Sequence, residues 1–289
     1  MTTFKICDIQ RSTVDDVIKY TLQDERFGKN EVSSIHKVDK DILCLPTQTN
    51  CKMGCKFCHL TGTTRPSRNL ASTWLSSAVN FWVEKEHLED HSRDLLISFM
   101  GVGEPLINIA GVIGSIEALQ TKYEGRIRFG ISTMLPNPCA LEHLTEWLAY
   151  KKEFRVKLHL SVHGIFNRGA IINSPLTAAE SIHLVQDFQA RTGRPIEFHY
   201  TLVDGINDSI NELTAFSSLV RTSSKDVTIK FLTLSETNGC KATQLSHEEI
   251  RALFCENIVE FYDPPGRDVG ASCGMFNRDL YNTTSKDEF

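Results

Sequence analysis

From about residue 41 onward the sequence alternates short β-rich segments with amphipathic helical segments, and this alternation limits the fold more than any other feature. The predicted strands cover residues 42–47, 95–100, 127–132, 156–162, 196–203 and 227–234. The predicted helices cover residues 72–88, 109–122, 140–151, 177–191, 210–222 and 247–260. Six successive βα units favour a parallel sheet with right-handed crossovers. Because a closed barrel needs eight units, we predict an α/β fold, an open partial (β/α)6 TIM-like barrel, with its chemistry at the carboxyl ends of the strands.

Residues 1–40 show a different pattern. Ile18, Tyr20 and Leu22 alternate with polar residues, a turn-like segment follows, and a second β-rich run covers residues 31–38. This pattern predicts an N-terminal β-hairpin extension, although a helix over residues 13–22 is an alternative. The expected organisation is a hairpin extension over residues 1–40, a barrel over 41–265 and a C-terminal segment over 266–289.

Composition restricts the class of protein. The 289 residues are 41% apolar, which is enough for one substantial core, and no apolar run has the length of a membrane span. The start of the chain lacks the apolar region of a signal peptide, and nine cysteines, an odd number, fit a reducing cytoplasm better than a disulfide scaffold. The net charge of −5 does not indicate an extended nucleic-acid-binding face. A local basic patch would suffice for that purpose, and one surrounds the cysteine loop at Lys52, Lys56, Arg65 and Arg68.

Three cysteines occur in one short loop directly after the first barrel strand. Cys51, Cys55 and Cys58 have the spacing C-x3-C-x2-C, which supplies three thiolates. A structural zinc site needs four protein ligands and would have to borrow His59 or a distant cysteine. A [4Fe–4S] cluster can be held by three cysteines, which leaves one iron free to bind the amino and carboxylate groups of S-adenosylmethionine (SAM). With Phe57 before the third cysteine, this loop resembles the signature of the radical SAM superfamily.

A second motif follows the next predicted strand, in residues 100–106 (Met-Gly-Val-Gly-Glu-Pro-Leu). Its glycines, including Gly103, allow the backbone to approach a ligand closely, and Glu104 could accept hydrogen bonds from an ammonium group. Alone the motif is weak. In this position it resembles the Gly-Gly-Glu element that holds the amino group of SAM.

Two further cysteines narrow the resemblance to one family. Cys44 precedes Cys51 by seven residues, and Cys273 lies near the C-terminus. Together with residues 67–70, 131–133, 160–163 and 199–208, they closely resemble the RlmN/Cfr family of radical SAM RNA methyltransferases, which methylate C2 or C8 of adenine. The resemblance extends from about residue 15 to residue 276.

The resemblance implies a role for each matching residue. Cys51, Cys55 and Cys58 would hold the cluster. SAM would be contacted by Gly103, Glu104, Ser132, Ser161, Val162, His163 and Ser235. Cys273 would take a methyl group from one SAM, and a radical made from a second SAM would remove hydrogen from that S-methyl group so that the carbon radical adds to adenine. Glu31 would remove the ring proton, and Cys44 would resolve the adduct by forming a disulfide with Cys273.

The sequence departs from the family pattern at three points. The chain begins almost at the hairpin, where family members usually carry a helical accessory domain. Ser235 replaces an asparagine that contacts SAM, and Met275-Phe276 replace Gln-Leu. The resemblance implies methylation at C2, rather than C8, of adenine in tRNA and/or 23S rRNA. Because the accessory domain is missing, we expect a small folded RNA such as tRNA to be the preferred substrate.

The remaining expectations concern partners and alternatives. The expected partners are the RNA and an electron donor such as flavodoxin or ferredoxin, and the chain is expected to act as a monomer. The alternatives are a radical SAM enzyme of another reaction class and a non-catalytic Fe–S or zinc RNA-binding protein.

Overall fold

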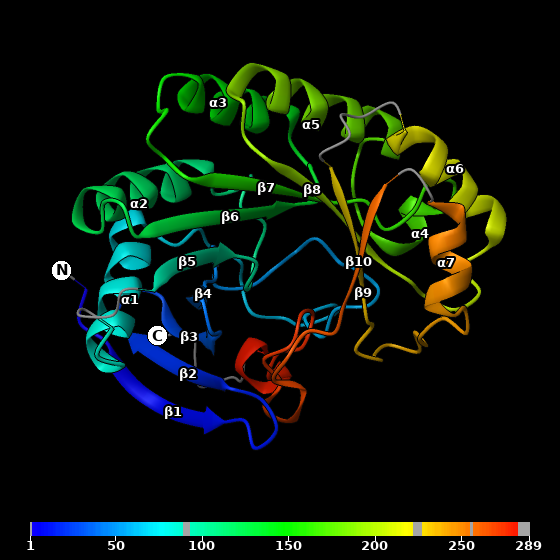
Figure 1. The fold of residues 1–289 in the computed structure, drawn as a ribbon. Helices are drawn as coiled ribbons and strands as arrows, with labels where there is room; N and C mark the ends of the chain where they lie inside the picture. Colours follow the sequence, from blue (N-terminus) through cyan, green and yellow to red (C-terminus); the bar gives the residue numbers. More distant parts are fainter. Residues whose placement is uncertain (1, 89–92, 222–226, 255–256, 283–289) are drawn as a thin grey trace.

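The computed structural model describes residues 2–88, 93–221, 227–254 and 257–282. Its strands form one ten-stranded sheet in which the spatial order follows the chain from β1 to β10. Figure 1 shows this sheet curved into an open barrel, with the helices on its outer face. The predicted α/β fold with an open, partial barrel is confirmed.

The first four strands are antiparallel to one another. They are β1 (Lys5–Arg11), β2 (Val17–Asp24), β3 (Gly28–His36) and β4 (Lys40–Cys44). Strands β2 and β3 form the predicted hairpin, so the alternative helix over residues 13–22 is wrong. The strand β1 was not predicted, because its residues are largely exposed and carry little of the apolar alternation that marks a half-buried strand.

From β4 onward the strands are parallel. They continue with β5 (Asp94–Phe99), β6 (Ile127–Thr133), β7 (Val156–Ser161), β8 (Ile196–Thr201), β9 (Thr228–Leu232) and β10 (Ile258–Tyr262). The last of these corrects a prediction, because the helix expected over residues 247–260 ends at Leu253. The run Ile-Val-Glu-Phe-Tyr is β-branched and aromatic, and it pairs with β9 as a seventh parallel strand.

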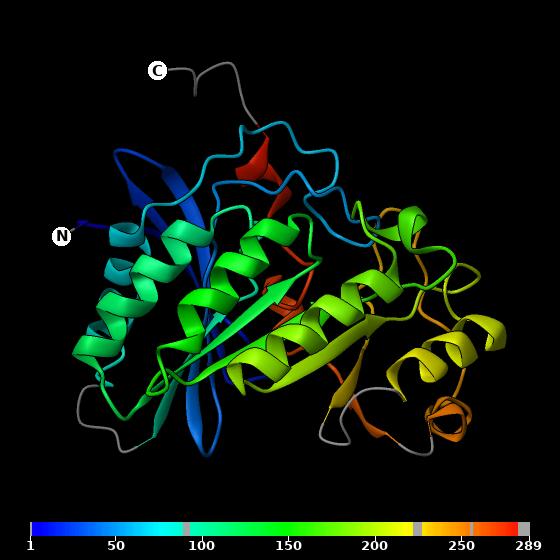
Figure 2. The same ribbon diagram turned by 90° about the horizontal axis from the view of Figure 1, so that it is seen from above.

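Six helices of the described residues form a layer against the outer face of the sheet, as Figure 2 shows from above. They are α1 (Ser72–Lys85), α2 (Ile109–Lys122), α3 (Pro138–Ala149), α5 (Ala178–Thr192), α6 (Ile210–Val220) and α7 (His247–Leu253). The short helix α4 (Arg168–Ile171) lies beside the cysteine loop instead, where the Lys56 N–H donates to the Ile171 carbonyl (2.8 Å). The predicted end of the helix over 210–222 reaches residue 222, which lies outside the described residues. Capping boxes begin α5, at Thr177 and Glu180, and α7, at Ser246 and Glu249. None of the helices in the described ranges is long and apolar enough to cross a membrane.

The C-terminal segment fills the gap between the two edges of the sheet, where Figure 1 shows it beside β2 and β9. Asp268 accepts hydrogen bonds from the Ser12 hydroxyl (2.8 Å) and from the Thr13 backbone N–H (2.8 Å). The Gly266 N–H donates to the Asp15 carboxylate (2.7 Å). These contacts attach the segment to the loop before β2 and bring Cys273 to the open side of the barrel.

Candidate active site

The cysteine loop is shaped by its own hydrogen bonds. The Asn50 side chain accepts from the Cys51 N–H (2.8 Å) and donates to the Arg65 carbonyl (2.6 Å). The Thr61 hydroxyl donates to the Cys55 carbonyl (2.6 Å). Cys51, Cys55 and Cys58 all line a cavity of about 150 Å³, which we call the cysteine-loop cavity. Burial raises the pKa of each of the three thiols, to about 12 for Cys58, so a bound cation would be needed to hold them as thiolates.

The loop fits a cluster better than a single zinc ion. His59, the candidate fourth ligand, directs its Nδ1 toward the Phe276 carbonyl (3.3 Å) and does not line the cavity. Within the described residues, the one group of three His, Cys, Asp or Glu ligand atoms that all lie within 4.8 Å of one another is elsewhere, in β7 and β8. Thiolates on one tetrahedral zinc ion would lie about 4 Å apart, given Zn–S bonds of about 2.3 Å. The spread of the three sulfur atoms therefore suits a larger group.

Glu104 lies in the wall of the same cavity, in the loop after β5. Its side chain is buried and accepts hydrogen bonds from the backbone N–H groups of Leu106 (3.1 Å) and Met134 (3.1 Å). Burial nevertheless raises its pKa to about 7. A cationic ligand such as an ammonium group would offset this cost, which is the chemistry expected of this residue.

Gly103 places Glu104 by close packing against the loop that leaves β4. Its φ of +105° belongs to a region that favours glycine, and a Cβ there would lie 2.8 Å from both Cβ and Cγ of Gln48. The Gln48 side chain in turn accepts a hydrogen bond from the Glu104 N–H (3.0 Å). Residues 100–106 therefore form a turn in which Gln48 leaves no space for a side chain at position 103.

Four of the other predicted SAM contacts also line the cysteine-loop cavity, namely Ser132, Ser161, His163 and Ser235. The Ser235 hydroxyl is buried and has no hydrogen-bond partner among the described residues, so it is free to bind a ligand. Val162 does not line the cavity. Its side chain is fully buried, and its backbone N–H donates to the His199 carbonyl (2.9 Å), which gives it a structural role here.

His163 is held rigidly at the end of β7. Its Nδ1 accepts a hydrogen bond from the Thr201 N–H (2.9 Å), and its ring meets the Phe57 ring edge-to-face at 4.9 Å. Burial lowers its pKa well below the usual value, so the imidazole is neutral. This suits contact with a ligand rather than proton transfer.

A second, larger cavity of about 980 Å³ occupies the inside of the barrel, and we call it the barrel cavity. Alternate residues of β3 to β10 line it, as expected for one face of a sheet. Glu31, Cys44 and Cys273 all contribute to its wall. The fold thus brings three residues from β3, β4 and the C-terminal segment together in the wall of the barrel cavity.

Cys273 lines both cavities. Its thiol is accessible through them, although protein surrounds it and burial raises its pKa. The nearby Lys230 ammonium opposes that rise and favours the thiolate. Burial raises the pKa of Cys44 to about 12, and a negative charge on Cys273 would raise it further. Both cysteines are free thiols, so the disulfide that the family resemblance implies is not present in this structure.

Glu31 is buried on β3 and forms an ion pair with Lys19 (3.0 Å from Nζ to Oε1). Its other carboxylate oxygen accepts a hydrogen bond from the Asn277 N–H (3.3 Å). Lys19 also donates to the Gly270 carbonyl (3.4 Å). The carboxylate is therefore fixed between the hairpin and the C-terminal segment.

Sequence reasoning missed several residues of these cavities. Met134 lines the cysteine-loop cavity with its sulfur 3.1 Å from the Cys55 sulfur. Arg168 lines neither cavity but supports this wall, because it donates to the carbonyls of Ser161 (3.1 Å) and Met134 (2.9 Å). His159, Glu197 and His199 line the barrel cavity. The signal for the last two was available, because polar residues two apart in a β-rich run face the same side of a sheet.

Known proteins resemble this chain in sequence and in structure. No family model matches the chain. A probable dual-specificity RNA methyltransferase RlmN from Thermotoga neapolitana is 26% identical over 280 residues, covering 94% of this chain and 78% of that protein. One of the same name from Moorella thermoacetica is 30% identical over 245 residues, covering 82% of this chain and 68% of that protein.

Among solved structures, a radical SAM methyltransferase from Sphaerobacter thermophilus superposes with a TM-score of 0.81. It is 22% identical and covers 96% of this chain and 82% of that protein. The fold is that of radical SAM enzymes. The chain belongs to the RlmN family of RNA methyltransferases.

Proposed function

We propose that this protein methylates C2 of adenine in RNA through an S-methyl group carried on Cys273, with a [4Fe–4S] cluster and SAM as its cofactors. The observation that carries the proposal is the position of Cys273 in the shared wall of the two cavities. A thiol in this place can receive a group on one side and deliver it on the other.

The residues of the cysteine-loop cavity suit the two cofactors. Cys51, Cys55 and Cys58 would hold the cluster, and Glu104 would accept hydrogen bonds from the ammonium group of SAM. Four side chains that line the cavity would complete the SAM site, namely Ser132, Ser161, His163 and Ser235. Bound there, the cluster would pass one electron, taken from a donor such as flavodoxin or ferredoxin, to SAM and so generate the radical that activates the methyl group.

Cys273 would act first as a nucleophile. Its thiolate would attack the methyl carbon of SAM and break the bond between that carbon and the sulfonium sulfur, which would leave S-methylcysteine and release S-adenosylhomocysteine. Lys230 helps this step because its positive charge favours the thiolate. Adenine C2 is electron-poor and does not itself attack a methyl sulfonium, so a carrier that can be activated as a carbon radical is needed.

Glu31 and Cys44 would complete the reaction from the barrel cavity. After the S-methylene radical of Cys273 has added to C2, the adduct would return one electron to the oxidised cluster, and Glu31, whose carboxylate is paired with Lys19, would remove the ring proton. The Cys44 thiolate would then attack the Cys273 sulfur and break its bond to the methylene carbon, which takes up a proton to complete the methyl group on the released base. The resulting disulfide would be returned to two thiols by a cellular thiol reductant.

The barrel cavity favours a single, exposed nucleobase as the substrate. Its volume lies at the upper end of the range of small-molecule sites, and a base can enter only after it has left a helical stack. Adenines in loops of a folded RNA meet this condition most easily. We therefore propose tRNA as the preferred substrate over 23S rRNA.

The test is an anaerobic assay of tRNA and 23S rRNA fragments with SAM that carries a fully deuterated methyl group. Digested RNA is examined by mass spectrometry. We expect 2-methyladenosine with two deuterium atoms, because the radical removes one before transfer, and more product from tRNA. A triply deuterated methyl group would show direct transfer and overturn the proposal, and so would a product from a Cys273→Ala variant.

A further inference from the structure

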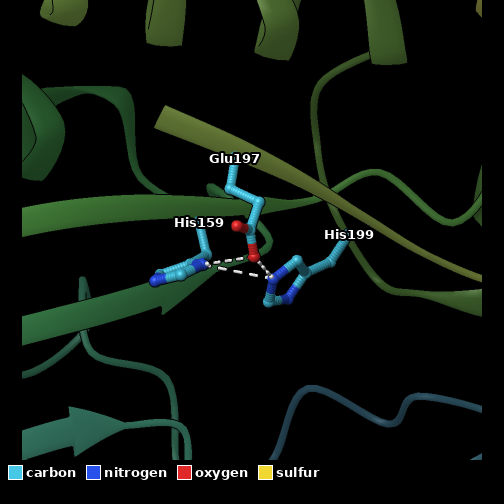
Figure 3. Close-up of side chains that lie close together, drawn as sticks. All are labelled: His159, Glu197 and His199. Atoms are coloured by element: carbon cyan, nitrogen blue, oxygen red, sulfur yellow. Dashed lines mark hydrogen bonds and ion pairs between the residues drawn. The ribbon is translucent and has the colours of Figure 1, made fainter. Parts of the chain in front are cut away.

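A cluster of two histidines and one carboxylate lies inside the barrel, and one of its members, His199, also lines the cysteine-loop cavity. His159 belongs to β7, and Glu197 and His199 belong to β8. All three side chains are buried and line the barrel cavity. Figure 3 shows the two rings and the carboxylate turned toward one another.

The three donor atoms converge on one point. His159 Nδ1 lies 3.2 Å from Glu197 Oε1 and 3.1 Å from His199 Nε2, and the latter nitrogen lies 2.7 Å from Oε1. Metal–ligand bonds of about 2.0–2.1 Å place neighbouring ligand atoms about 2.9–3.4 Å apart in octahedral and tetrahedral sites. The cluster therefore has nearly the dimensions of one face of a coordination polyhedron.

The protonation states suit a metal ion. Burial lowers the pKa of both histidines, to about 4 for His159, so each imidazole offers a lone pair at neutral pH. In the metal-free protein, hydrogen bonds from the two histidines lower the pKa of Glu197 despite its burial, so the carboxylate is ionised. A bound metal ion would take the place of these two ring protons, which a neutral imidazole can carry on its other nitrogen. Three electron-pair donors this close repel one another unless a proton or a cation lies between them.

Two lysines compete for the carboxylate and have to be weighed against a metal. Lys157 binds Oε2, the oxygen that does not face the histidines. Lys230 binds Oε1 (2.9 Å), where it occupies one direction that a metal would use. Lys230 also lies 3.4 Å from the Glu260 carboxylate, so it keeps a partner if an ion takes its place on Oε1.

We propose that His159, Glu197 and His199 bind one divalent first-row transition metal, such as Zn²⁺ or Fe²⁺, inside the barrel. Two imidazoles and one carboxylate are a ligand set that suits these metals, whereas Mg²⁺ and Ca²⁺ prefer oxygen alone. The remaining coordination positions face the barrel cavity, where water or a nitrogen or oxygen atom of the substrate can bind. The ion would also tie β7 to β8.

The first experiment measures binding in the full-length enzyme with its iron–sulfur cluster assembled. The enzyme is treated with a chelator under anaerobic conditions, dialysed against Zn²⁺, and examined for metal content and zinc X-ray absorption. We expect one zinc per chain with nitrogen and oxygen neighbours at about 2.0–2.1 Å. Zinc with sulfur neighbours alone, at about 2.3 Å, would place the ion in the cysteine loop and overturn the proposal, as would no zinc.

Variants then locate the site. His159→Gln and His199→Gln should each weaken zinc binding at least tenfold, whereas His183→Gln, an exposed histidine on α5, should leave it unchanged. Lys230→Met should tighten binding, because it removes the competing cation and no ligand. This last variant answers the question even if the histidine variants fold poorly. Equal binding by all variants would refute the site.

Discussion

Two glutamates, the half-buried Glu86 just after α1 and the buried Glu104 in the loop after β5, show how differently this molecule uses the same residue. Glu86 accepts hydrogen bonds from the Tyr20 hydroxyl (2.6 Å), the Ser34 hydroxyl (2.7 Å) and the Trp82 indole N–H (2.6 Å), and it pairs with His36 (3.2 Å). Although burial opposes ionisation, these donors lower its pKa. Glu104 has no cationic partner in the described structure, and burial raises its pKa to about 7.

The difference separates structure from function. We call Glu86 and its four partners the Glu86 cluster. These partners fully bind the Glu86 carboxylate and join α1 to the hairpin, so the carboxylate requires no ligand from outside the protein. The cysteine-loop cavity, in contrast, is lined by groups that can still bind a ligand, namely Glu104, the unpartnered Ser235 hydroxyl and the three thiols. Changes on the cavity side should therefore reduce function more than stability, and changes in the Glu86 cluster should do the reverse.

The largest effect should come from the cysteine loop. Cys55→Ser removes one of three thiols and should reduce iron content and methylation below detection while the protein still folds. The matched control is Cys139→Ser, an exposed cysteine at the start of α3 that lines neither cavity. Measurement of iron, of product and of the thermal midpoint tests both halves of the expectation. Full activity in Cys55→Ser would contradict the cluster assignment.

Glu31→Gln should be the next most severe change. The amide oxygen can keep one of the two contacts, to Lys19 or to the Asn277 N–H, but the amide cannot take a proton, so turnover should fall about 10²–10⁴-fold. RNA should remain bound covalently to Cys273, because the adduct would form and fail to resolve. Denaturing gel electrophoresis with labelled RNA detects this species. A variant that is inactive without any adduct would assign Glu31 an earlier role.

Gly103→Ala should weaken SAM binding at least tenfold, because a Cβ would meet Gln48 and shift Glu104. Gly125→Ala is a close control, since Gly125 also has a positive φ (+80°) but no atom within 4 Å of the added Cβ. Both substitutions place alanine at a positive φ, which costs about 1 kcal/mol, but only Gly103→Ala also creates a steric clash with Gln48. Equilibrium binding of SAM distinguishes them. Equal affinities would mean that the turn does not position Glu104.

The smallest effect concerns the Glu86 cluster and pH. The hydrogen bond to Glu86 raises the pKa of His36 to about 9, against 6.5 in its ordinary state. The contribution of protonated His36 to the free energy of unfolding is therefore complete below about pH 6.5 and is lost as the pH rises through about 9. Denaturant unfolding should show a loss on the order of 2 kcal/mol over this range. His36→Gln should flatten the profile, and an unchanged slope would contradict this origin.

Local patterns predicted much of this molecule. The alternation of strands and helices gave the partial barrel, and the capping residues Ser246 and Glu249 gave the start of α7. The strand β10 was missed because no glycine or proline separates its residues from α7, so the helical pattern continued into it. Motifs in the cysteine loop and after β5 predicted part of the wall of the cysteine-loop cavity, because the residues of each motif are close together in the sequence.

The pair of cavities could not be predicted in the same way. The meeting of His159 with Glu197 depends on the register of β7 and β8, which pairs these two residues directly. The register of two strands depends on the packing of the whole sheet, so it cannot be predicted from a single sequence. The placement of Cys273 likewise depends on contacts of the C-terminal segment with residues some 250 positions earlier in the chain.

The central claim is that Cys273 carries the methyl group between the two cavities. Mass spectrometry of the Cys273 peptide from anaerobically purified enzyme tests it most directly, and needs no RNA. We predict one added methyl group on Cys273 that disappears when Cys51, Cys55 or Cys58 is replaced. An unmodified Cys273 in protein that holds a cluster and cleaves SAM would contradict the account and indicate a radical SAM reaction of another class.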